Sequence, residues 1–295
     1  MRVIEQDGSV SRISCRAKGV LRRDEEKVLV GDEVKIRVSE NEREGIVISE
    51  LLPRRNMLIR PPLANLDYLF IVISSKKPTP TLETVDKLLA IAEHNKIEPV
   101  VIITKSDLSE ECAEEYRRIY ELSGYTVFVT SSEEGEGIAA LKEYIEKTVK
   151  DGKTAAFAGA SGVGKSTLMN ALFQGLSLAT SEISQKIERG RHTTRHVEIY
   201  EISEGADTGL LADTPGFSMI DFSRFDFFAL EDLADSFREI RAYTGRCRYA
   251  DCAHVGEGAS ECAVARAAMD GEIAESRLES YRSIYRVLKE KATYG

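Results

Sequence analysis

The sequence lacks the long apolar runs that a membrane protein needs. No stretch approaches the roughly 18 consecutive apolar residues of a spanning helix. The N-terminus, from Met1 to Gly8, has no apolar segment typical of a secretion signal. We therefore expect a protein of the cytoplasm that makes no contact with a membrane. At 295 residues, the chain is long enough for about two to three domains.

Cysteine is scarce, and positive charge is outnumbered by negative charge. Three of the five cysteines crowd into one late segment and two stand alone, which argues against a disulfide framework and predicts reduced thiols. The formal net charge of −9 argues against indiscriminate nucleic-acid binding, because such binding depends on neutralising phosphates. Local basic clusters could still contact RNA, although each alone is more often a solvated surface. The candidate clusters are Arg22 with Arg23, Arg54 and Arg55 with Arg60, Lys186 with Arg189, Arg191 and Arg195, and Arg238 with Arg241, Arg246 and Arg248.

Short β-type segments separated by turns occupy the first 64 residues. Their length and spacing are typical of small antiparallel strands. They predict a barrel of the OB type, a fold whose face and loops commonly bind oligonucleotides. A β module used only for packing or protein contact is the alternative, because fold alone does not fix function. The segments are Val3–Ile4, Val28–Val30, Val34–Val38 and Gly45–Ile48.

After Pro61 and Pro62, which stop a strand ladder, apolar runs alternate with segments of helical spacing. Strands that are apolar on both faces and alternate with helices are typical of a doubly wound, mainly parallel sheet. Such a sheet binds its ligands at the carboxyl ends of its strands. The predicted strands are Tyr68–Ile73, Pro99–Ile103, Tyr125–Val129, Ala155–Ala158 and Leu210–Ala212, and the predicted helices are Thr81–Asn95, Ser109–Leu122 and Ile138–Lys150.

The stretch Gly159–Ser166 fits the phosphate-binding pattern G-x-x-x-x-G-K-[ST] at every fixed position, between an apolar strand and a helical segment. Its glycines let backbone N–H groups and a helix N-terminus point at an anion. Lys165 would then reach the β- and γ-phosphates, and the hydroxyl of Ser166 would ligate Mg²⁺. The predicted contact residues are Gly159, Ala160, Ser161, Gly162, Val163, Gly164, Lys165, Ser166 and Thr167.

Directly after the second strand of this region, Thr104–Asp107 resembles the N-K-x-D motif with which GTPases read guanine. The carboxylate of Asp107 would accept from the N1–H and 2-amino groups of guanine, which adenine does not offer. The stem of Lys105 would lie over the base, and Ser106 completes the segment. Thr104 departs from the motif, because its side chain cannot reproduce both hydrogen bonds of an asparagine amide. We expect nucleotide affinity to suffer while Asp107 still selects guanine.

Two more segments resemble GTPase motifs. Ser131 and Ser132 follow the third strand, in a loop similar to the one that supports guanine O6 through a backbone N–H. Leu210–Gly216 resembles the D-x-x-G motif. Asp213 would hold Mg²⁺ through water, and the N–H of Gly216 would sense the γ-phosphate.

Between the phosphate loop and this last motif lies a polar loop, Arg189–His196, in the position of switch I. Thr194 is the predicted second hydroxyl on magnesium, with Thr193 as the alternative. The order of motifs is therefore base loop, second base loop, phosphate loop, switch I and switch II, which is a rotation of the usual GTPase order. Because the chain ends of compact domains lie at the surface and close together, such a rotation preserves the packed sheet.

The residue after Gly216 cannot orient the water molecule that attacks GTP. Phe217 stands where a Ras-like protein has a glutamine, and it can neither donate nor accept a hydrogen bond. His192 is the best candidate, because an imidazole can hold water and titrates near neutral pH. Packing or RNA contact is the alternative role for His192, and His196 is the weaker rival.

The tail contains three cysteines and one histidine with the spacing C-x4-C-x-H-x7-C. Such a set matches a closed, tetrahedral structural zinc site, and free thiols are the alternative. One Zn²⁺ per chain would supply folding energy to a segment with little core of its own. The predicted ligands are Cys247, Cys252, His254 and Cys262, and the predicted helices of the tail are Leu230–Ile240 and Ile273–Lys291.

Together, the β-barrel, the permuted motif order with G-R-H-T-T and D-T-P-G-F, and the cysteine-rich tail resemble the RsgA family of small ribosomal subunit biogenesis GTPases. The resemblance covers essentially the whole chain, with Thr104 and Ser132 as departures from the motifs. It implies a protein that binds GTP and GDP, partners the 30S subunit and its 16S rRNA, hydrolyses GTP with ribosome stimulation and acts in late subunit maturation. It also implies that His192 serves hydrolysis.

We therefore predict a circularly permuted α/β P-loop GTPase domain (residues 65–224) between an N-terminal OB-type β-barrel (1–64) and a C-terminal helical zinc-binding domain (225–295). Lys165 and His192 are the predicted catalytic residues, and a monomer is expected. Two other classes stay open. One is an NTPase of different specificity, such as an ATPase or a kinase. The other is an RNA-binding assembly factor whose nucleotide site only switches conformation.

Overall fold

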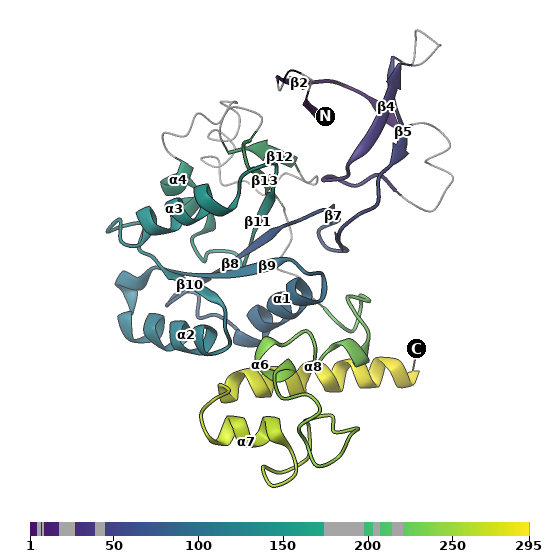
Figure 1. Cartoon of the computed structure of the whole chain (residues 1–295). Helices are drawn as coiled ribbons and strands as arrows, with labels where there is room; N and C mark the ends of the chain where they lie inside the picture. Colours follow the sequence, from purple (N-terminus) through teal and green to yellow (C-terminus); the bar gives the residue numbers. More distant parts are fainter. Residues whose placement is uncertain are drawn as a thin grey trace.

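The structure is a computed structural model and describes residues 1–4, 7, 9–17, 27–38, 45–173, 198–202, 207–213 and 221–294. Figure 1 shows an N-terminal group of small strands, a central sheet with helices on both faces, and a helical tail. Nowhere in the described ranges is a helix both long and apolar enough to cross a bilayer.

The N-terminal strands pair locally in small sheets. β1 (Arg2–Ile4) pairs antiparallel with β2 (Val10–Arg12). β5 (Ile46–Leu51) lies between β3 (Arg16–Ala17), to which it is parallel, and β4 (Val34–Val38), to which it is antiparallel. A hairpin of β6 (Met57–Leu58) and β7 (Leu63–Ala64) leads into the central sheet.

The predicted strand at Val28–Val30 is wrong as a regular element. Of the residues Val28–Val30, all of which the structure describes, only Val30 forms a β-bridge, and its partner is the single residue Leu63. The backbone N–H of Leu29 instead donates to the carboxylate of Asp32 over 2.7 Å, so a local turn uses the donor that a strand ladder would need.

The central sheet has six strands in the order β10-β9-β8-β11-β13-β12. Neighbouring strands are parallel except for β12, which is antiparallel to β13. β11, the strand before the phosphate loop, therefore lies between β8 and β13. The strands are β8 (Tyr68–Ser74), β9 (Glu98–Thr104), β10 (Thr126–Val129), β11 (Thr154–Ala158), β12 (Glu198–Glu201) and β13 (Leu210–Asp213).

Helices cover both faces of this sheet, as Figure 1 shows. α1 (Leu82–His94) and α2 (Glu110–Leu122) lie on one face, and α3 (Ile138–Thr148) and α4 (Lys165–Phe173) lie on the other. Side chains alternate along a strand, so β8 serves both cores. Its residues Leu69, Ile71 and Ile73 pack in the core under α1 and α2, whereas Phe70 and Val72 pack in the core under α3 and α4.

The tail contains the short turn η2 (Leu230–Asp232), α6 (Arg238–Arg241), α7 (Ala263–Met269) and the long helix α8 (Glu275–Tyr294). The single helix predicted for Leu230–Ile240 is wrong, because Phe237 is extended, with φ −120° and ψ 109°. This backbone places the Phe237 ring edge-on against Tyr281, with centroids 5.4 Å apart, so packing overrides local helix propensity.

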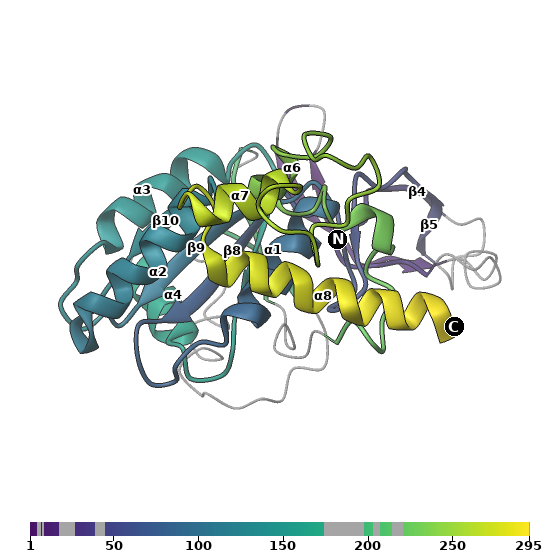
Figure 2. The same ribbon diagram turned by 90° about the horizontal axis from the view of Figure 1, so that it is seen from below.

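A buried ion triad fastens the tail to the central domain. Figure 2 shows α8 passing across α1, and Arg277 on α8 donates to Asp86 on α1 over 2.6 Å. Arg277 also donates to Glu239 on α6 over 2.6 Å, and its guanidinium lies 4.6 Å from the centroid of the Phe237 ring. The three charged side chains are at most 4% exposed. Each buried charge thus has an opposite partner, as a stable buried ion group requires.

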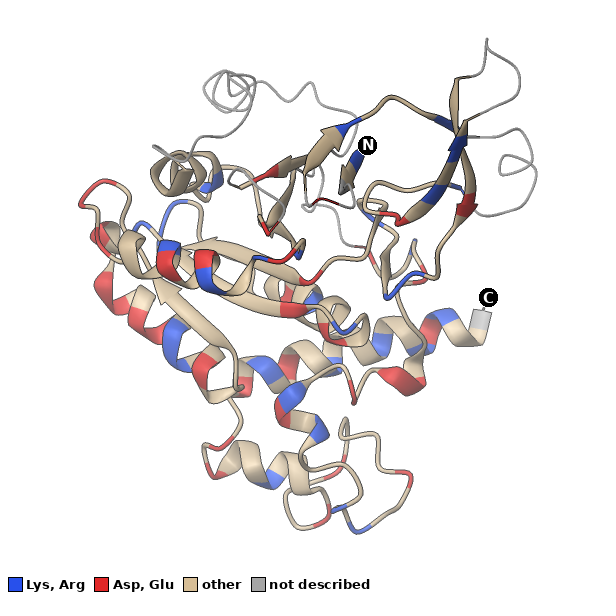
Figure 3. Cartoon of the chain, turned by 45° about the horizontal axis from the view of Figure 1, so that its top comes forward, with Lys and Arg blue, Asp and Glu red and all other residues tan. Residues whose placement is uncertain are grey.

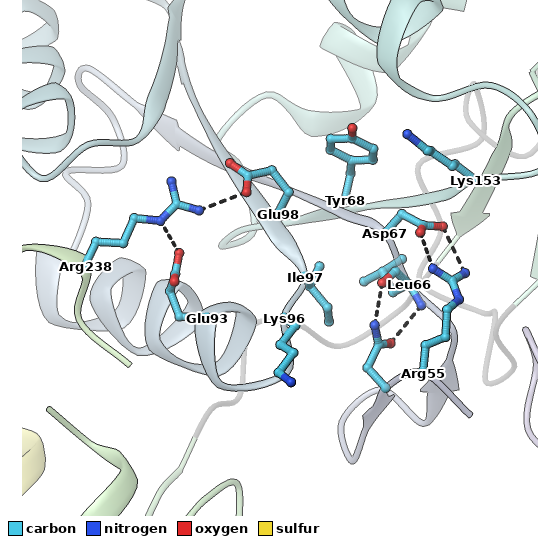
Figure 4. A pocket seen from close by; sticks show the side chains of 11 residues that line it. Arg55, Leu66, Asp67, Tyr68, Glu93, Lys96, Ile97, Glu98, Lys153 and Arg238 are labelled. Atoms are coloured by element: carbon cyan, nitrogen blue, oxygen red, sulfur yellow. Dashed lines mark hydrogen bonds and ion pairs between the residues drawn. The ribbon is translucent and has the colours of Figure 1, made fainter. Parts of the chain in front are cut away.

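A hollow of about 390 Å³ lies at the amino ends of β8 and β9. Figure 4 shows the side chains that line it. There, Arg238 of the tail pairs with Glu93 of α1, and Arg55 of the N-terminal segment pairs with Asp67. The carboxylate of Asp67 also accepts from the backbone N–H of Thr154 at the start of β11, over 2.8 Å. These contacts join the N-terminal segment and the tail to the sheet edge opposite the phosphate loop.

Candidate nucleotide-binding and metal sites

β11 delivers the phosphate loop, Gly159–Ser166, to the carboxyl edge of the sheet. Gly159 has φ 146°, and a Cβ at this position would lie 2.2 Å from the carbonyl oxygen of Val72 on β8, so the close approach of the two strands requires glycine. Val163 is buried in the core beneath α4 and anchors the middle of the loop. Ser166 and Thr167 are exposed in the first turn of α4, where backbone N–H groups favour an anion.

The side chain of Lys165 folds back over this loop. Its ammonium donates to the carbonyl oxygens of Gly159 and Ala160 over 2.6 and 2.7 Å. Burial lowers the pKa of Lys165 below its usual value. A phosphate beside the ammonium would oppose this lowering, because an opposite charge favours the charged form. The side chain can therefore exchange two carbonyl partners for an anionic one.

The predicted base-reading segment packs directly on the phosphate loop. Thr104 ends β9 and is 2% exposed, and its hydroxyl lies 3.0 Å from the carbonyl oxygen of Ile73 and 2.5 Å from that of Val163. Lys105 has φ 58°, and its ammonium donates to the carbonyl oxygen of Gly162 over 2.8 Å. The base-reading segment and the phosphate loop are thus hydrogen-bonded to each other at the sheet edge.

Asp107 stands exposed in the turn η1 (Ser106–Leu108), which follows Lys105. The buried hydroxyl of Ser131, from the loop after β10, donates to its Oδ1 over 2.6 Å. Ser132 follows at a half-buried position. One carboxylate oxygen is therefore fixed by the neighbouring loop, and the exposed group can accept hydrogen bonds from a ligand.

The structure brings together three of the predicted segments, 104–107, 131–132 and 159–167, at the carboxyl ends of β9, β10 and β11. Asp213 ends β13, the strand beside β11, and only its backbone is described. The other predicted positions lie outside the described residues; these are His192, Thr193, Thr194, His196, Gly216 and Phe217.

Two residues at the carboxyl edge of the sheet contact the base-reading segment but were not predicted from the sequence. The hydroxyl of Ser75 donates to the carbonyl oxygen of Lys105 over 2.5 Å. The carbonyl oxygen of Lys77 accepts from the Lys105 ammonium over 2.7 Å. Neither residue belongs to a motif, and only the pairing of β8 with β9 places the loop after β8 beside the base-reading segment.

The four predicted metal ligands come together in the tail, with their ligand atoms all within 4.8 Å of one another. The Nδ1 atom of His254 lies 3.5 Å from the sulfurs of Cys247 and Cys252 and 3.4 Å from that of Cys262. In a tetrahedral zinc site, Zn–S and Zn–N bonds of about 2.3 and 2.0 Å place sulfur and nitrogen about 3.5 Å apart. The donor set and its spacing therefore fit Zn²⁺.

Backbone groups around the cluster favour thiolate ligands. The N–H of Ala263 donates to the sulfur of Cys247 over 3.3 Å, and the N–H of Ala265 donates to that of Cys262 over 3.4 Å. Burial raises the pKa of Cys252 to about 12, so a cation is needed to hold this thiolate at neutral pH. Burial lowers the pKa of His254, which favours the neutral imidazole that binds metals.

Comparison with known proteins assigns most of the chain to one family. The model of the RsgA N-terminal domain matches residues 4–47, and that of the RsgA GTPase matches residues 51–223. Two relatives are named small ribosomal subunit biogenesis GTPase RsgA. The relative from Bacillus velezensis is 40% identical, over 95% of this chain and 90% of its own length. That from Bacillus subtilis 168 is 37% identical, over 97% of this chain and 93% of its own length.

Two solved structures are similar over nearly the whole length. YjeQ from Thermotoga maritima is 35% identical, with a TM-score of 0.71 over 95% of this chain and 91% of that one. YloQ, described as a circularly permuted GTPase, is 30% identical, with a TM-score of 0.73 over 98% of this chain and 91% of that one. The predicted fold class, a permuted GTPase domain between an OB-type N-terminal domain and a helical metal-binding tail, is confirmed. By family model, sequence and structure, the chain belongs to the RsgA GTPase family.

Proposed function

We propose that this protein is a GTPase that acts in the biogenesis of the small ribosomal subunit and hydrolyses GTP to GDP and phosphate, with stimulation by the 30S subunit. Its curated relatives, named for that role, share 37–42% identity with most of the chain. The observation that carries the proposal is the direct bonding of the phosphate loop to the base-reading segment, through Thr104 to Val163 and Lys105 to Gly162. A nucleotide bridging these segments would present guanine to Asp107 and phosphates to Lys165.

In this proposal, the chain stabilises charge and positions water. Lys165 and the backbone N–H groups of Gly159–Thr167 hold the β- and γ-phosphates, where negative charge develops during transfer. Mg²⁺, bound with GTP, would neutralise phosphate charge; Ser166 and Thr194 would contact it directly and Asp213 through water. Gly216 would sense the γ-phosphate. His192 would orient the attacking water, because Phe217 cannot.

The base pocket in this proposal is built from 104–107 and 131–132. Asp107 accepts from the guanine N1–H and 2-amino groups, Lys105 covers the base plane, and backbone N–H groups near Ser131 and Ser132 face O6. The fixed Asp107 carboxylate supports this assignment, because a preset acceptor pair favours guanine over adenine.

The tail cluster is proposed to hold one structural Zn²⁺ per chain through Cys247, Cys252, His254 and Cys262. Four protein ligands leave no position for a substrate, so the metal would stabilise the fold. α8 supports the site from behind: the hydroxyl of Tyr281 donates to the carbonyl oxygen of Ala253 over 3.0 Å.

We assign the predicted domains, 1–64, 65–224 and 225–295, to RNA contact, nucleotide chemistry and metal-stabilised support respectively. Figure 3 shows basic segments along the N-terminal strands, and Arg16 and Arg37 are exposed there. This supports contact with 16S rRNA in spite of the negative net charge, because local cations can neutralise phosphates. The proposed setting is the cytoplasm, with the protein acting as a monomer.

The test is GTP turnover with and without 30S subunits. Lys165→Ala and Ser166→Ala should abolish hydrolysis, and Lys147→Ala, an exposed lysine on α3, serves as the control. Undiminished turnover in both phosphate-loop variants would refute the assignment. A competition between GTP and ATP separates a GTPase from an NTPase of other specificity, and 30S binding with negligible turnover would identify a switch without hydrolysis.

A further inference from the structure

Thr104 has its single hydroxyl committed to the protein backbone. The side chain is 2% exposed, and its Oγ1 lies within hydrogen-bond distance of the carbonyl oxygens of Ile73 and Val163. These two residues belong to β8 and to the phosphate loop, so the hydroxyl ties the base-reading strand to both. A Cβ on Gly164 would lie 3.5 Å from the same oxygen, which is ordinary van der Waals contact, so Thr104 also packs beside the last glycine of the phosphate loop.

The single hydroxyl proton of Thr104 limits the hydrogen bonds that this side chain can donate to a ligand. A hydroxyl has one proton to donate, and two buried acceptors already compete for it. Withdrawing the proton toward a ligand would leave buried carbonyl groups without a partner, which is unfavourable. The asparagine of the motif that Thr104–Asp107 resembles carries two N–H donors. It could hold the Val163 carbonyl with one N–H and keep the other for the base.

The acceptors of guanine that this site can read lie on a different side of the ring system from its donors. N7 and O6 accept on one side of the ring system, while the 2-amino group donates from the other. The exposed carboxylate of Asp107 suits the donor edge. The ammonium of Lys105 donates two of its three protons to the carbonyl oxygens of Lys77 and Gly162, which hold it at the phosphate loop. In the proposed site the stem of Lys105 covers the base plane, so its ammonium does not lie at the ring edge that carries N7.

We propose that this protein binds guanine nucleotides without a hydrogen bond to N7, so that guanine is selected at the edge that Asp107 reads. Thr104 then acts as a positioning residue that holds the phosphate loop against β8 and β9. The inference rests on the proposed function, because it requires Thr104–Asp107 to hold guanine.

The experiment compares the binding of GDP and 7-deaza-GDP, in which a carbon replaces N7, to the full chain. The unmodified protein should bind both within about twofold, because no hydrogen bond is lost. Thr104→Asn should create a preference for GDP of about fivefold, the size of one neutral hydrogen bond. A fivefold preference for GDP in the unmodified protein would overturn the proposal, and this comparison stands even where the variant fails to fold.

Two controls separate this proposal from the proposed function. Thr104→Val keeps the shape and removes the proton, so it should weaken GDP and 7-deaza-GDP alike and leave their ratio unchanged; a changed ratio would overturn the proposal. IDP, which lacks the 2-amino group, should bind more weakly than GDP in every variant, because Asp107 loses a partner. Equal binding of GDP, IDP and ADP would overturn guanine recognition itself, and this inference with it.

Discussion

The hydroxyl of Ser131 donates to Oδ1 of Asp107 over 2.6 Å from a fully buried position in the loop after β10. The same hydroxyl accepts from the backbone N–H of Glu134 over 3.2 Å, so it is fixed by its own loop. Two loops that follow different strands thereby hold one carboxylate in a single orientation.

Replacing Ser131 with alanine should lower GDP affinity by about tenfold. A hydrogen bond to a charged group contributes about 1.5 kcal/mol, which corresponds to a tenfold change in affinity. ATP binding should stay weak, because the carboxylate itself remains. Isothermal titration with both nucleotides measures the effect. Ser132→Ala is the control and should change GDP affinity little, since its predicted contact is made by the backbone. Equal affinities of the two variants would exclude the positioning role of Ser131.

The ion triad predicts a strong dependence of stability on Arg277. Arg277→Ala leaves Asp86 and Glu239 buried without their partner, and we expect a loss of about 3–5 kcal/mol in the free energy of unfolding. Denaturant unfolding followed by far-UV circular dichroism measures it. Arg286→Ala, an exposed arginine on the same helix, should cost far less. A similar midpoint for both variants would contradict the expectation.

Removal of the metal should destabilise the tail. Cys252→Ser should lower the bound zinc below one per chain and increase hydrogen exchange in α7, whereas Cys112→Ser, outside the cluster, should keep both unchanged. Mass spectrometry of the intact protein and of its exchanged peptides gives both quantities. Full zinc occupancy in Cys252→Ser would exclude this residue as a ligand.

Zinc affinity should fall as the pH falls. The pKa of Cys252 is raised in the metal-free fold, so its thiol is protonated at neutral pH and must release that proton on binding. Competition with a chelator between about pH 8 and pH 6 should show weaker binding at the lower pH, because protons compete with the cation. A pH-independent affinity would rule out proton release.

His192→Ala should slow GTP turnover on 30S subunits by about a hundredfold, the lower range for loss of a general acid or base. GDP affinity should stay nearly intact, since the proposed role is to hold water. His196→Ala should have the smaller effect on turnover. Unchanged turnover in His192→Ala would transfer the role to another residue.

Local pattern was enough to predict most of the central domain. The runs at β8 and β9 are apolar on both faces because helices cover both sides, and the start of α2 follows from Ser109, whose hydroxyl accepts from the N–H of Cys112. The break at Phe237 was missed, because it depends on a ring of α8 that lies far away in the sequence.

The candidate site, too, has features that could be predicted from the sequence and features that could not. The phosphate loop is predictable because its glycines are required by backbone geometry, as at Gly159 beside Val72. The contacts of Ser75 and Lys77 were not, because they exist only once β8 lies next to β9. The hydrogen bond from Thr104 to the carbonyl oxygen of Val163 also needs the assembled sheet. It takes the place of one of the two hydrogen bonds that an asparagine at position 104 could donate.

The place of β11 between β8 and β13 also orders events during synthesis. β8, β9 and β10 leave the translating ribosome before β11 does, and they can pair with one another before β11 has been synthesised. At a synthesis rate of about 5–20 residues per second, the side of β8 that pairs with β11 stays unpaired for several seconds. The nascent chain therefore gains its base-reading loops before its phosphate loop, and nucleotide can act as a folding ligand only after most of the protein has been made.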